Sequence, residues 1–211
     1  MAKRKKSQKE KKEEKEKRIA KKKQTEYQNK FLKILLIGAF AIIVLILSIA
    51  FISNYKNNFK YKGVEFSVVK FCDAKPCLTT YNTKIPIIYE NKPTVYNFFL
   101  RNDPRALNSE VNFDGELILR KNMSIDITFD TYCDGYEQIA IVNFVNLHNV
   151  AGITTTGESG AICDFTGKNM YVLIQESEET NIKQIGPACY VINVKNCDIL
   201  KATERFMLET L

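Results

Sequence analysis

The chain has 211 residues, with 31 Lys or Arg, 24 Asp or Glu and a formal net charge of +7. This length suffices for one folded domain in addition to an anchor. Residues 1–33 hold fifteen Lys or Arg against five Glu, whereas residues 34–211 hold sixteen against nineteen Asp or Glu. The positive excess therefore lies at the N-terminus, and residues 34–211 do not form a domain that is basic overall.

Residues 1–33 form a basic, low-complexity segment with almost no apolar side chains, so no hydrophobic core can form there. The pairs Glu13–Lys17 and Glu14–Arg18 favour a solvated helix. The expected partner of this segment is the anionic headgroups of a membrane. Nucleic acid is not expected as a partner, because Tyr27 and Phe31 are the only aromatic side chains available to stack on bases.

The stretch from Ile34 to Ile52 contains nineteen residues, no charge and Ser48 as its one polar side chain. As a helix it would be about 28 Å long, close to the hydrocarbon thickness of a lipid bilayer. The sequence therefore predicts one transmembrane helix, 34–52, with the basic segment in the cytoplasm and the C-terminal part outside it. We expect an uncleaved signal-anchor, because the preceding charged region is longer than that of a signal peptide; cleavage after Ala50 is the alternative.

Six cysteines all follow this span, which predicts disulfides in an oxidising compartment. Fifteen pairings are possible, and loop closure favours near neighbours. This argument predicts Cys72–Cys77, Cys189–Cys197 and, by elimination, Cys133–Cys163. Neither a metal site nor a cofactor is expected, since C-x-x-C spacings are lacking and the chain has one histidine.

Residues 53–62 are predicted to be a polar stalk, and residues 63–211 an extracytoplasmic α+β domain whose first half is antiparallel β-sheet. The loop Asn91-Lys92-Pro93 is expected to join two strands into a hairpin, and Lys121-Asn122 to join two more. The predicted strands of this half are Val64–Val68, Lys84–Tyr89, Thr94–Leu100, Glu116–Arg120 and Met123–Phe129.

The second half of the domain is predicted to mix helices and strands. We expect a helix over Tyr136–Val150, started by Asp134 and Glu137 as a capping box, with a strand as the alternative. A final helix over Asp198–Leu211 has one apolar face, and its opposite face carries Lys201, Glu204 and Arg205. Short strands are expected near Ile153–Thr155, Met170–Gln175 and Ala188–Val194.

Arg101 and Arg105 are candidate binding residues, because they flank a turn after a predicted strand and guanidinium groups bind carboxylates and phosphates in defined geometry. The alternative is that they pair with Asp103 or a neighbouring strand and fix the turn. Asn122 begins a glycosylation sequon. Ser159 between glycines, with His148 upstream, only partly matches a hydrolase nucleophile loop, and no catalytic residue is predicted.

The segments FFLRNDPRAL and CYVINVKNCDILKATERFMLETL resemble uncharacterised single-pass envelope proteins of small-genome archaea. The resemblance covers most of the domain after the span and implies an archaeal surface location but no activity. Our first hypothesis is a membrane-anchored cell-envelope protein whose outer domain binds or assembles with an unknown envelope protein. The alternative is an extracytoplasmic enzyme, either a hydrolase or a thiol–disulfide protein.

Overall fold

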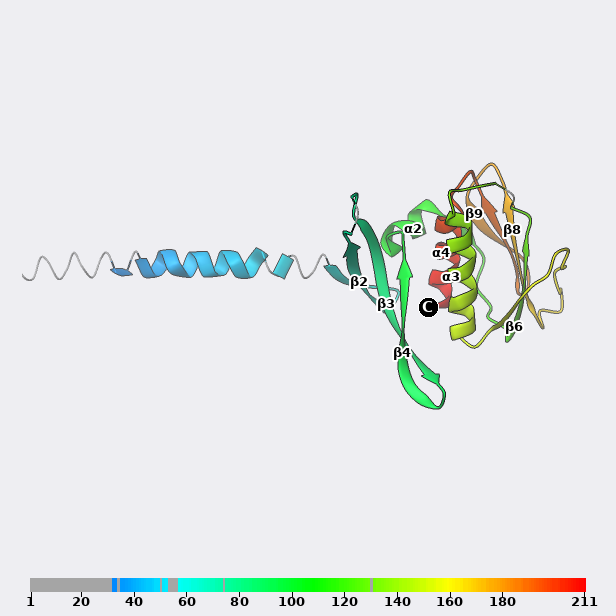
Figure 1. Cartoon of the computed structure of the whole chain (residues 1–211), viewed down its shortest axis with the longest axis horizontal. Helices are drawn as coiled ribbons and strands as arrows, with labels where there is room; N and C mark the ends of the chain where they lie inside the picture. The colour runs from blue at the N-terminus through cyan, green and yellow to red at the C-terminus, as the bar shows by residue number, and fades with distance from the viewer. Residues whose placement is uncertain (1–31, 34, 50, 53–56, 74, 130) are drawn as a thin grey trace, which may run out of the picture. The chain divides into compact units, whose positions relative to one another are not determined.

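The computed structural model describes residues 32–33, 35–49, 51–52, 57–73, 75–129 and 131–211 (Figure 1). The chain divides into two units, Met1–Lys56 and Asn57–Leu211. Within the described part of the chain, no helix combines the length and the apolar character that crossing a membrane requires. Almost all of the predicted basic segment, and Ile34 and Ala50 of the predicted span, lie outside the described residues.

The second unit begins with an antiparallel sheet, here called sheet A, whose four strands follow one another in chain order. Its predicted strands are confirmed, and it also includes residues that the sequence assigned to the polar stalk. The strands are β1 (Asn58–Tyr61), β2 (Val64–Phe71), β3 (Leu78–Tyr89) and β4 (Lys92–Leu100).

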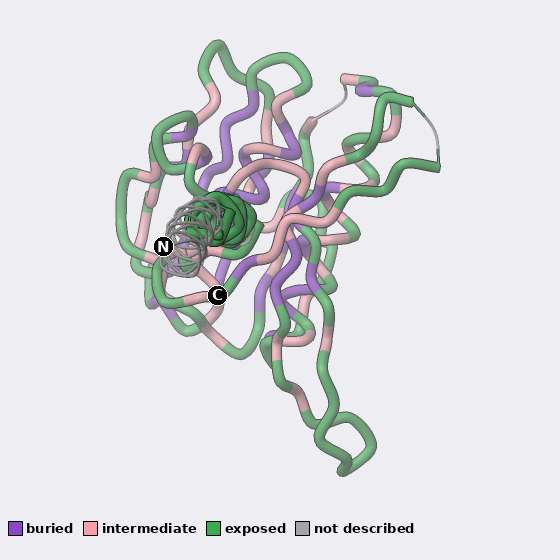
Figure 2. Tube along the Cα trace, turned by 90° about the vertical axis from the view of Figure 1, so that its left-hand side faces the viewer, coloured by how far each residue is buried: buried purple, intermediate pink, exposed green. Residues whose placement is uncertain are grey.

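Two-residue turns join β1 to β2 and β3 to β4. Glu90 and Asn91 form the second turn with φ of 50° and 61°, the positive values that such a tight hairpin requires. The predicted hairpin is confirmed, but its loop is shorter and lies earlier than Asn91-Lys92-Pro93, because Lys92 pairs with Tyr89 and already belongs to β4. The end of this hairpin is exposed, as Figure 2 shows, with Ile88 at 80% exposure.

A second, mixed sheet, here called sheet B, has the strand order β5-β9-β10-β8-β6-β7. Only β9 and β10 pair antiparallel; the other neighbours are parallel. The predicted α+β class and the antiparallel first sheet are confirmed, whereas the parallel pairing within sheet B was not predicted. The strands are β5 (Asn112–Asp114), β6 (Asn122–Ile127), β7 (Thr154–Gly157), β8 (Met170–Glu176), β9 (Asn181–Gly186) and β10 (Cys189–Val194).

The predicted hairpin between Glu116–Arg120 and Met123–Phe129 is wrong. Strand β6 instead lies between β8 and β7, parallel to both. The backbone of the first segment bonds to a side chain rather than to a strand: the Tyr190 hydroxyl accepts from Ile118 N at 2.7 Å and donates to Glu116 O at 2.9 Å. A side chain distant in sequence therefore satisfies backbone groups that a strand ladder would otherwise use.

The described residues of this unit also form three helices: α2 (Pro104–Glu110), α3 (Tyr136–Val150) and α4 (Ile199–Thr210). The bounds predicted for α3 are confirmed, but its predicted cap is wrong. Gly135, with φ of 86°, is the N-cap residue, no side chain caps the helix there, and Glu137 accepts a bond from Cys133 N instead. The sequence did not predict α2, in which Asp103 is the cap and Pro104 occupies the first turn.

Helices α3 and α4 lie between the two sheets (Figure 1), and this position buries most residues of α4. Phe206 of α4 contacts Phe144 of α3 and Tyr190 of β10, with ring centroids 5.4 and 5.3 Å apart. Of the predicted polar face of α4, only the Lys201 side chain reaches water, at 40% exposure; Glu204 is 0% exposed and Arg205 5% exposed. Sheet A and α2 cover the face that a helix on a single sheet would present to solvent.

Three disulfides form, and no cysteine is free. The predicted pair Cys72–Cys77 is confirmed, whereas the predictions Cys189–Cys197 and Cys133–Cys163 are wrong. Proximity in the folded domain, rather than in the sequence, decides these two pairs, because Cys197 precedes α4 and Cys133 precedes the neighbouring α3. The observed pairs are Cys133–Cys197, with a sequence separation of 64, and Cys163–Cys189, with a separation of 26.

Candidate binding groove beside strand β4

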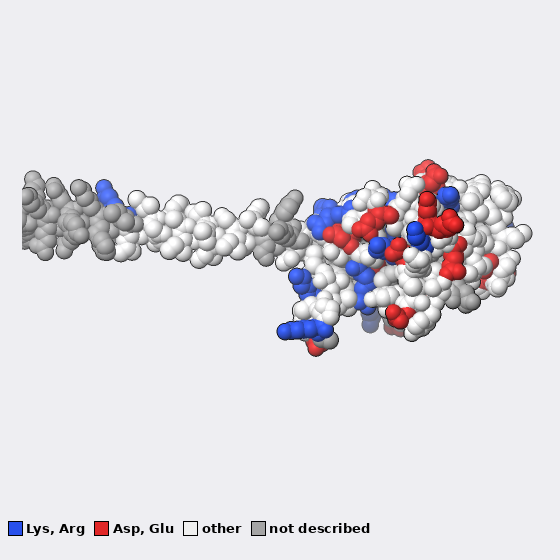
Figure 3. Space-filling model, turned by 90° about the horizontal axis from the view of Figure 1, so that it is seen from above, with Lys and Arg blue, Asp and Glu red and all other residues white. Residues whose placement is uncertain are grey.

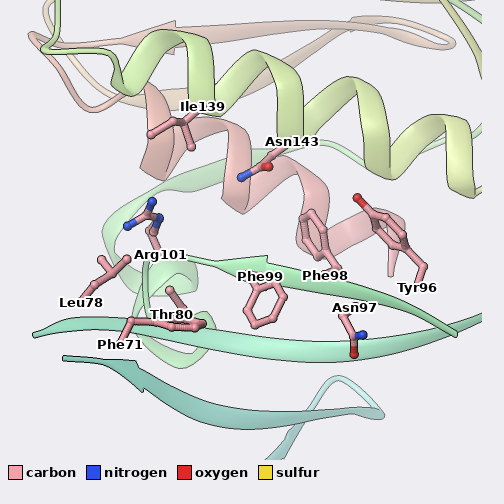
Figure 4. A pocket seen from close by; sticks show the side chains of 10 residues that line it. All are labelled: Phe71, Leu78, Thr80, Tyr96, Asn97, Phe98, Phe99, Arg101, Ile139 and Asn143. Atoms are coloured by element: carbon pink, nitrogen blue, oxygen red, sulfur yellow. The ribbon is translucent and has the colours of Figure 1, made fainter. Parts of the chain in front are cut away.

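An open groove of about 320 Å³ lies where the end of β4 faces α3 (Figure 4). Side chains of β2, β3 and β4 form one wall, and two side chains of α3 form the other. Its apolar members include Phe71, Leu78 and Phe99, which are 44%, 39% and 38% exposed. The lining residues are Phe71, Leu78, Thr80, Tyr96, Asn97, Phe98, Phe99, Arg101, Ile139 and Asn143.

The groove runs along the edge of β4 rather than over one face of sheet A. Four consecutive residues, Tyr96 to Phe99, line it. Successive side chains of a strand point to opposite faces of the sheet, so all four can border one space only where that space follows the strand edge. Figure 4 shows this alternation, with Tyr96 and Phe98 on the helix side of β4 and Asn97 and Phe99 on the other.

Arg101 closes one end of the groove, directly after β4 ends. Its side chain lies between Leu78 and Ile139 in Figure 4. Within the described part of the chain, its guanidinium takes no hydrogen bond or ion pair, although its backbone N–H donates to Glu204 Oε1 at 2.6 Å. The backbone is thus fixed while the cationic end of the side chain stays available to a ligand.

Glu204 of α4 organises the chain around Arg101. Its second carboxylate oxygen accepts from Asn102 N at 2.9 Å and from Asn102 Nδ2 at 2.8 Å. Burial raises the pKa of Glu204 to about 7, although these hydrogen bonds and the positive charge of Arg101 act in the opposite direction. A carboxylate on the most buried helix therefore holds the start of the turn that carries Arg101.

The structure does not bring Arg105 to the groove. Its guanidinium pairs with Asp103, with Nη2 to Oδ2 at 2.6 Å, and lies 4.0 Å from the centre of the Phe59 ring. The hydrogen bonds from Arg105 lower the pKa of Asp103 even though burial of that carboxyl group acts to raise it. Arg105 therefore fixes the turn, the alternative considered for both arginines, and only Arg101 remains as a candidate binding residue.

The other residues singled out in the sequence lie elsewhere. Asn122 begins β6 and is exposed, with Nδ2 3.4 Å from Asn169 Oδ1, and its glycosylation stays a prediction. Ser159 is in an exposed loop after β7. His148 is 0% exposed and both of its ring nitrogens have partners, so it is not available to activate Ser159.

His148 is a core residue. Its Nδ1 lies 2.7 Å from Phe144 O, so this nitrogen carries the proton, and Nε2 accepts from the Thr210 hydroxyl at 3.2 Å. Burial lowers the pKa of His148 to about 4, because the hydrogen bond to Phe144 O only partly offsets desolvation of the charged ring. The neutral ring links α3 to the end of α4.

His148 and Glu204 predict opposite effects of pH on stability. Glu204 has a raised pKa in the folded state, so its contribution to the free energy of unfolding falls by about 3 kcal/mol as pH rises from 4.5 to 7. His148 has a lowered pKa, so its contribution falls by a similar amount, about 3 kcal/mol, as pH falls from 6.5 to 4. The two effects offset each other over most of this range.

Single variants should therefore reveal the two pH dependences of stability that offset each other in the wild type. Denaturant unfolding of the His148→Leu protein is expected to show stability decreasing toward pH 7, and the Glu204→Gln protein to show stability decreasing toward pH 4. The wild type between pH 4.5 and 6.5 serves as the control with little slope. Parallel pH profiles for the two variants would contradict these assignments.

Several groove residues carry no distinctive sequence signal. Arg101 is a sequence candidate because it flanks a predicted turn, but Phe71, Leu78 and Phe99 are ordinary strand residues. Asn143 of α3 is half-buried at the groove. Apolar side chains left exposed at a strand edge can be recognised only once the sheet order is known.

Among the described residues, the groove therefore combines exposed aromatic and aliphatic side chains, a strand edge without a neighbouring strand and one guanidinium without a hydrogen bond or ion pair. Such a surface can bind an extended apolar chain and an anionic group together. Compared with protein-family models, with curated proteins and with solved structures, the chain matches none of them.

Proposed function

We propose that the protein is a single-pass cell-envelope protein, anchored in a lipid bilayer by residues 34–52, whose outer domain binds a partner protein. The basic segment 1–33 would lie in the cytoplasm against anionic headgroups, and Asn57–Leu211 would lie on the opposite side of the membrane. The archaeal envelope implied by the resemblance is the proposed setting. The proposal has three supports, of which the groove beside β4 carries the binding function.

The anchor is supported by the apolar side chains that are exposed along the described part of the first unit. The described large apolar residues between 35 and 52 range from 45% exposed at Val44 to 74% exposed at Phe51. A continuous apolar surface of this kind is costly in water and favourable in hydrocarbon. With the basic residues before it, this favours a bilayer around the segment.

The disulfides support an extracytoplasmic position for the domain. All six cysteines are paired, and two of the three bonds join residues more than twenty positions apart. Structural disulfides persist in oxidising compartments, whereas cytosolic thiols are kept reduced. The three disulfides therefore support a position of the domain on the outer, oxidising side of a membrane.

Binding is supported by the composition of the groove. Its exposed Phe71, Leu78 and Phe99 lose contact with water when a partner covers them, and Arg101 supplies a specific polar contact. Interface centres in proteins are enriched in aromatic residues and Arg. A protein partner satisfies both features of the site.

A site-directed crosslink tests the proposal. Full-length protein carrying p-benzoylphenylalanine in place of Phe99 is irradiated on intact cells, and crosslinked proteins are identified by mass spectrometry. We expect one defined partner at Phe99 and none at Phe165, a control position outside the groove that is 73% exposed. The same products at both positions, or no product at Phe99, would contradict partner binding at this site.

A further inference from the structure

We infer that the groove binds an extended, acidic segment of the partner, which adds as a fifth strand to the free edge of β4 with a carboxylate paired to Arg101. This inference rests on the proposed function and specifies how the partner is recognised. Three observations carry it: the free strand edge, the arrangement of the two walls, and the distribution of charge.

The first observation is that β4 ends sheet A. In the strand order β1-β2-β3-β4, its only neighbour among the described strands is β3. One side of its backbone therefore has amide and carbonyl groups without a strand partner, which is the template for strand addition. Pro93 lies near the hairpin turn and lacks an N–H, so pairing is favoured toward the Arg101 end of β4.

The second observation is that the groove has walls suited to a strand. Tyr96 to Phe99 border it along the edge of β4, and Ile139 and Asn143 of α3 face them (Figure 4). Side chains of an added strand would point alternately to the two faces of sheet A. Those on one side would meet Phe99 and Phe71, whose rings lie 6.2 Å apart, and those on the other side would meet Ile139 and Asn143.

The third observation is charge. Residues 57–105, which contain all of sheet A, hold eight Lys or Arg and four Asp or Glu, a net of +4, whereas residues 106–211 hold seven and fifteen, a net of −8. In Figure 3, red side chains are more frequent over the part of the domain away from sheet A. The groove therefore lies in the basic part of the domain, where an acidic segment is attracted.

The charge also disfavours a second copy of this chain as the occupant. Edge-to-edge pairing of two β4 strands would bring two segments of net charge +4 together and would leave both Arg101 side chains without a carboxylate. An acidic segment provides that carboxylate and keeps the guanidinium hydrogen-bonded as water leaves the groove.

The test uses full-length protein in lipid nanodiscs and a random dodecapeptide library displayed on phage. We expect enriched peptides to alternate apolar residues with Asp or Glu. A synthetic enriched peptide should lose at least about tenfold in affinity for the Arg101→Gln protein, because a charge-assisted bond is removed. The control Lys183→Gln, which removes a positive charge from exposed Lys183 of β9 in sheet B, should change affinity less than about twofold.

The strand geometry is tested in the peptide itself. Single N-methylation along the backbone should weaken binding at every second residue, because alternate amides face β4 and the intervening ones face away. Asn143→Trp, which fills the groove from α3, should also lower the peptide affinity at least about tenfold, and it serves as a second variant if Arg101→Gln disturbs the turn. Unfolding midpoints of all variants confirm that each protein is folded.

Absence of enriched acidic peptides, uniform N-methyl sensitivity, or equal affinities of the Arg101 and Lys183 variants would overturn the inference. A crosslinked dimer of this chain through Phe99 would overturn it in favour of self-association. If Phe99 still captures a distinct partner, these results leave the proposed function intact. If no protein is crosslinked at Phe99, the proposed function is contradicted as well.

Discussion

Replacing Phe206 with alanine is expected to lower the free energy of unfolding of the outer domain by about 3–5 kcal/mol. Phe206 is 0% exposed and lies at the centre of the core. Its ring is 5.3 to 6.0 Å from those of Tyr190, Phe144, His148 and Phe113, which come from two strands of sheet B and from α3. These neighbours belong to separate elements that cannot close together over the space, so the truncation leaves a cavity.

The measurement is denaturant unfolding of the full-length protein with its disulfides intact, followed by circular dichroism. Phe165→Ala is the matched control, because Phe165 is 73% exposed, and its effect should stay within about 0.5 kcal/mol. A loss for Phe206→Ala below about 1 kcal/mol would show that α4 is not packed between the sheets as described.

Removing the Cys133–Cys197 disulfide is expected to cost about 4 kcal/mol in the chain-entropy model, because it closes a loop with a sequence separation of 64. The bond also joins the segment before α3 to Cys197, two residues before α4, and so fixes the starts of these two packed helices relative to each other. Removing Cys72–Cys77, with a separation of 5, should cost only about 2 kcal/mol, since its loop is short.

Paired serine variants, Cys133→Ser with Cys197→Ser and Cys72→Ser with Cys77→Ser, allow this comparison by thermal and denaturant unfolding. Thiol labelling under mild reductant gives an independent check. Cys72 and Cys77 are both exposed and should react first, whereas Cys133 and Cys189 are buried and should react only as the domain opens. A larger loss for the Cys72–Cys77 variant than for the Cys133–Cys197 variant would contradict the expected order.

The sequence by itself determined features that depend on local pattern. The alternation around Val64–Val68 predicts a strand, the stretch before Ala151-Gly152 predicts the end of α3, and the apolar spacing after Asp198 predicts α4. Hydrophobic periodicity and turn-forming residues act over a few neighbouring positions, so the elements that they predict are present in the folded domain. An even number of cysteines, all placed after the apolar stretch, likewise predicts that they form disulfides.

Only the tertiary structure decided which residues meet. Cys197 pairs with Cys133 rather than Cys189, because α3 and α4 pack side by side and loop closure costs only weakly more for a longer loop. Glu204 and Arg205 are buried because a second sheet covers the far side of α4, an arrangement that helical periodicity does not encode. Arg101 and Arg105 cannot be told apart from the sequence. In the structure Arg105 pairs with Asp103, whereas Arg101 lines the groove. A guanidinium is available for binding only where no neighbour has already paired with it.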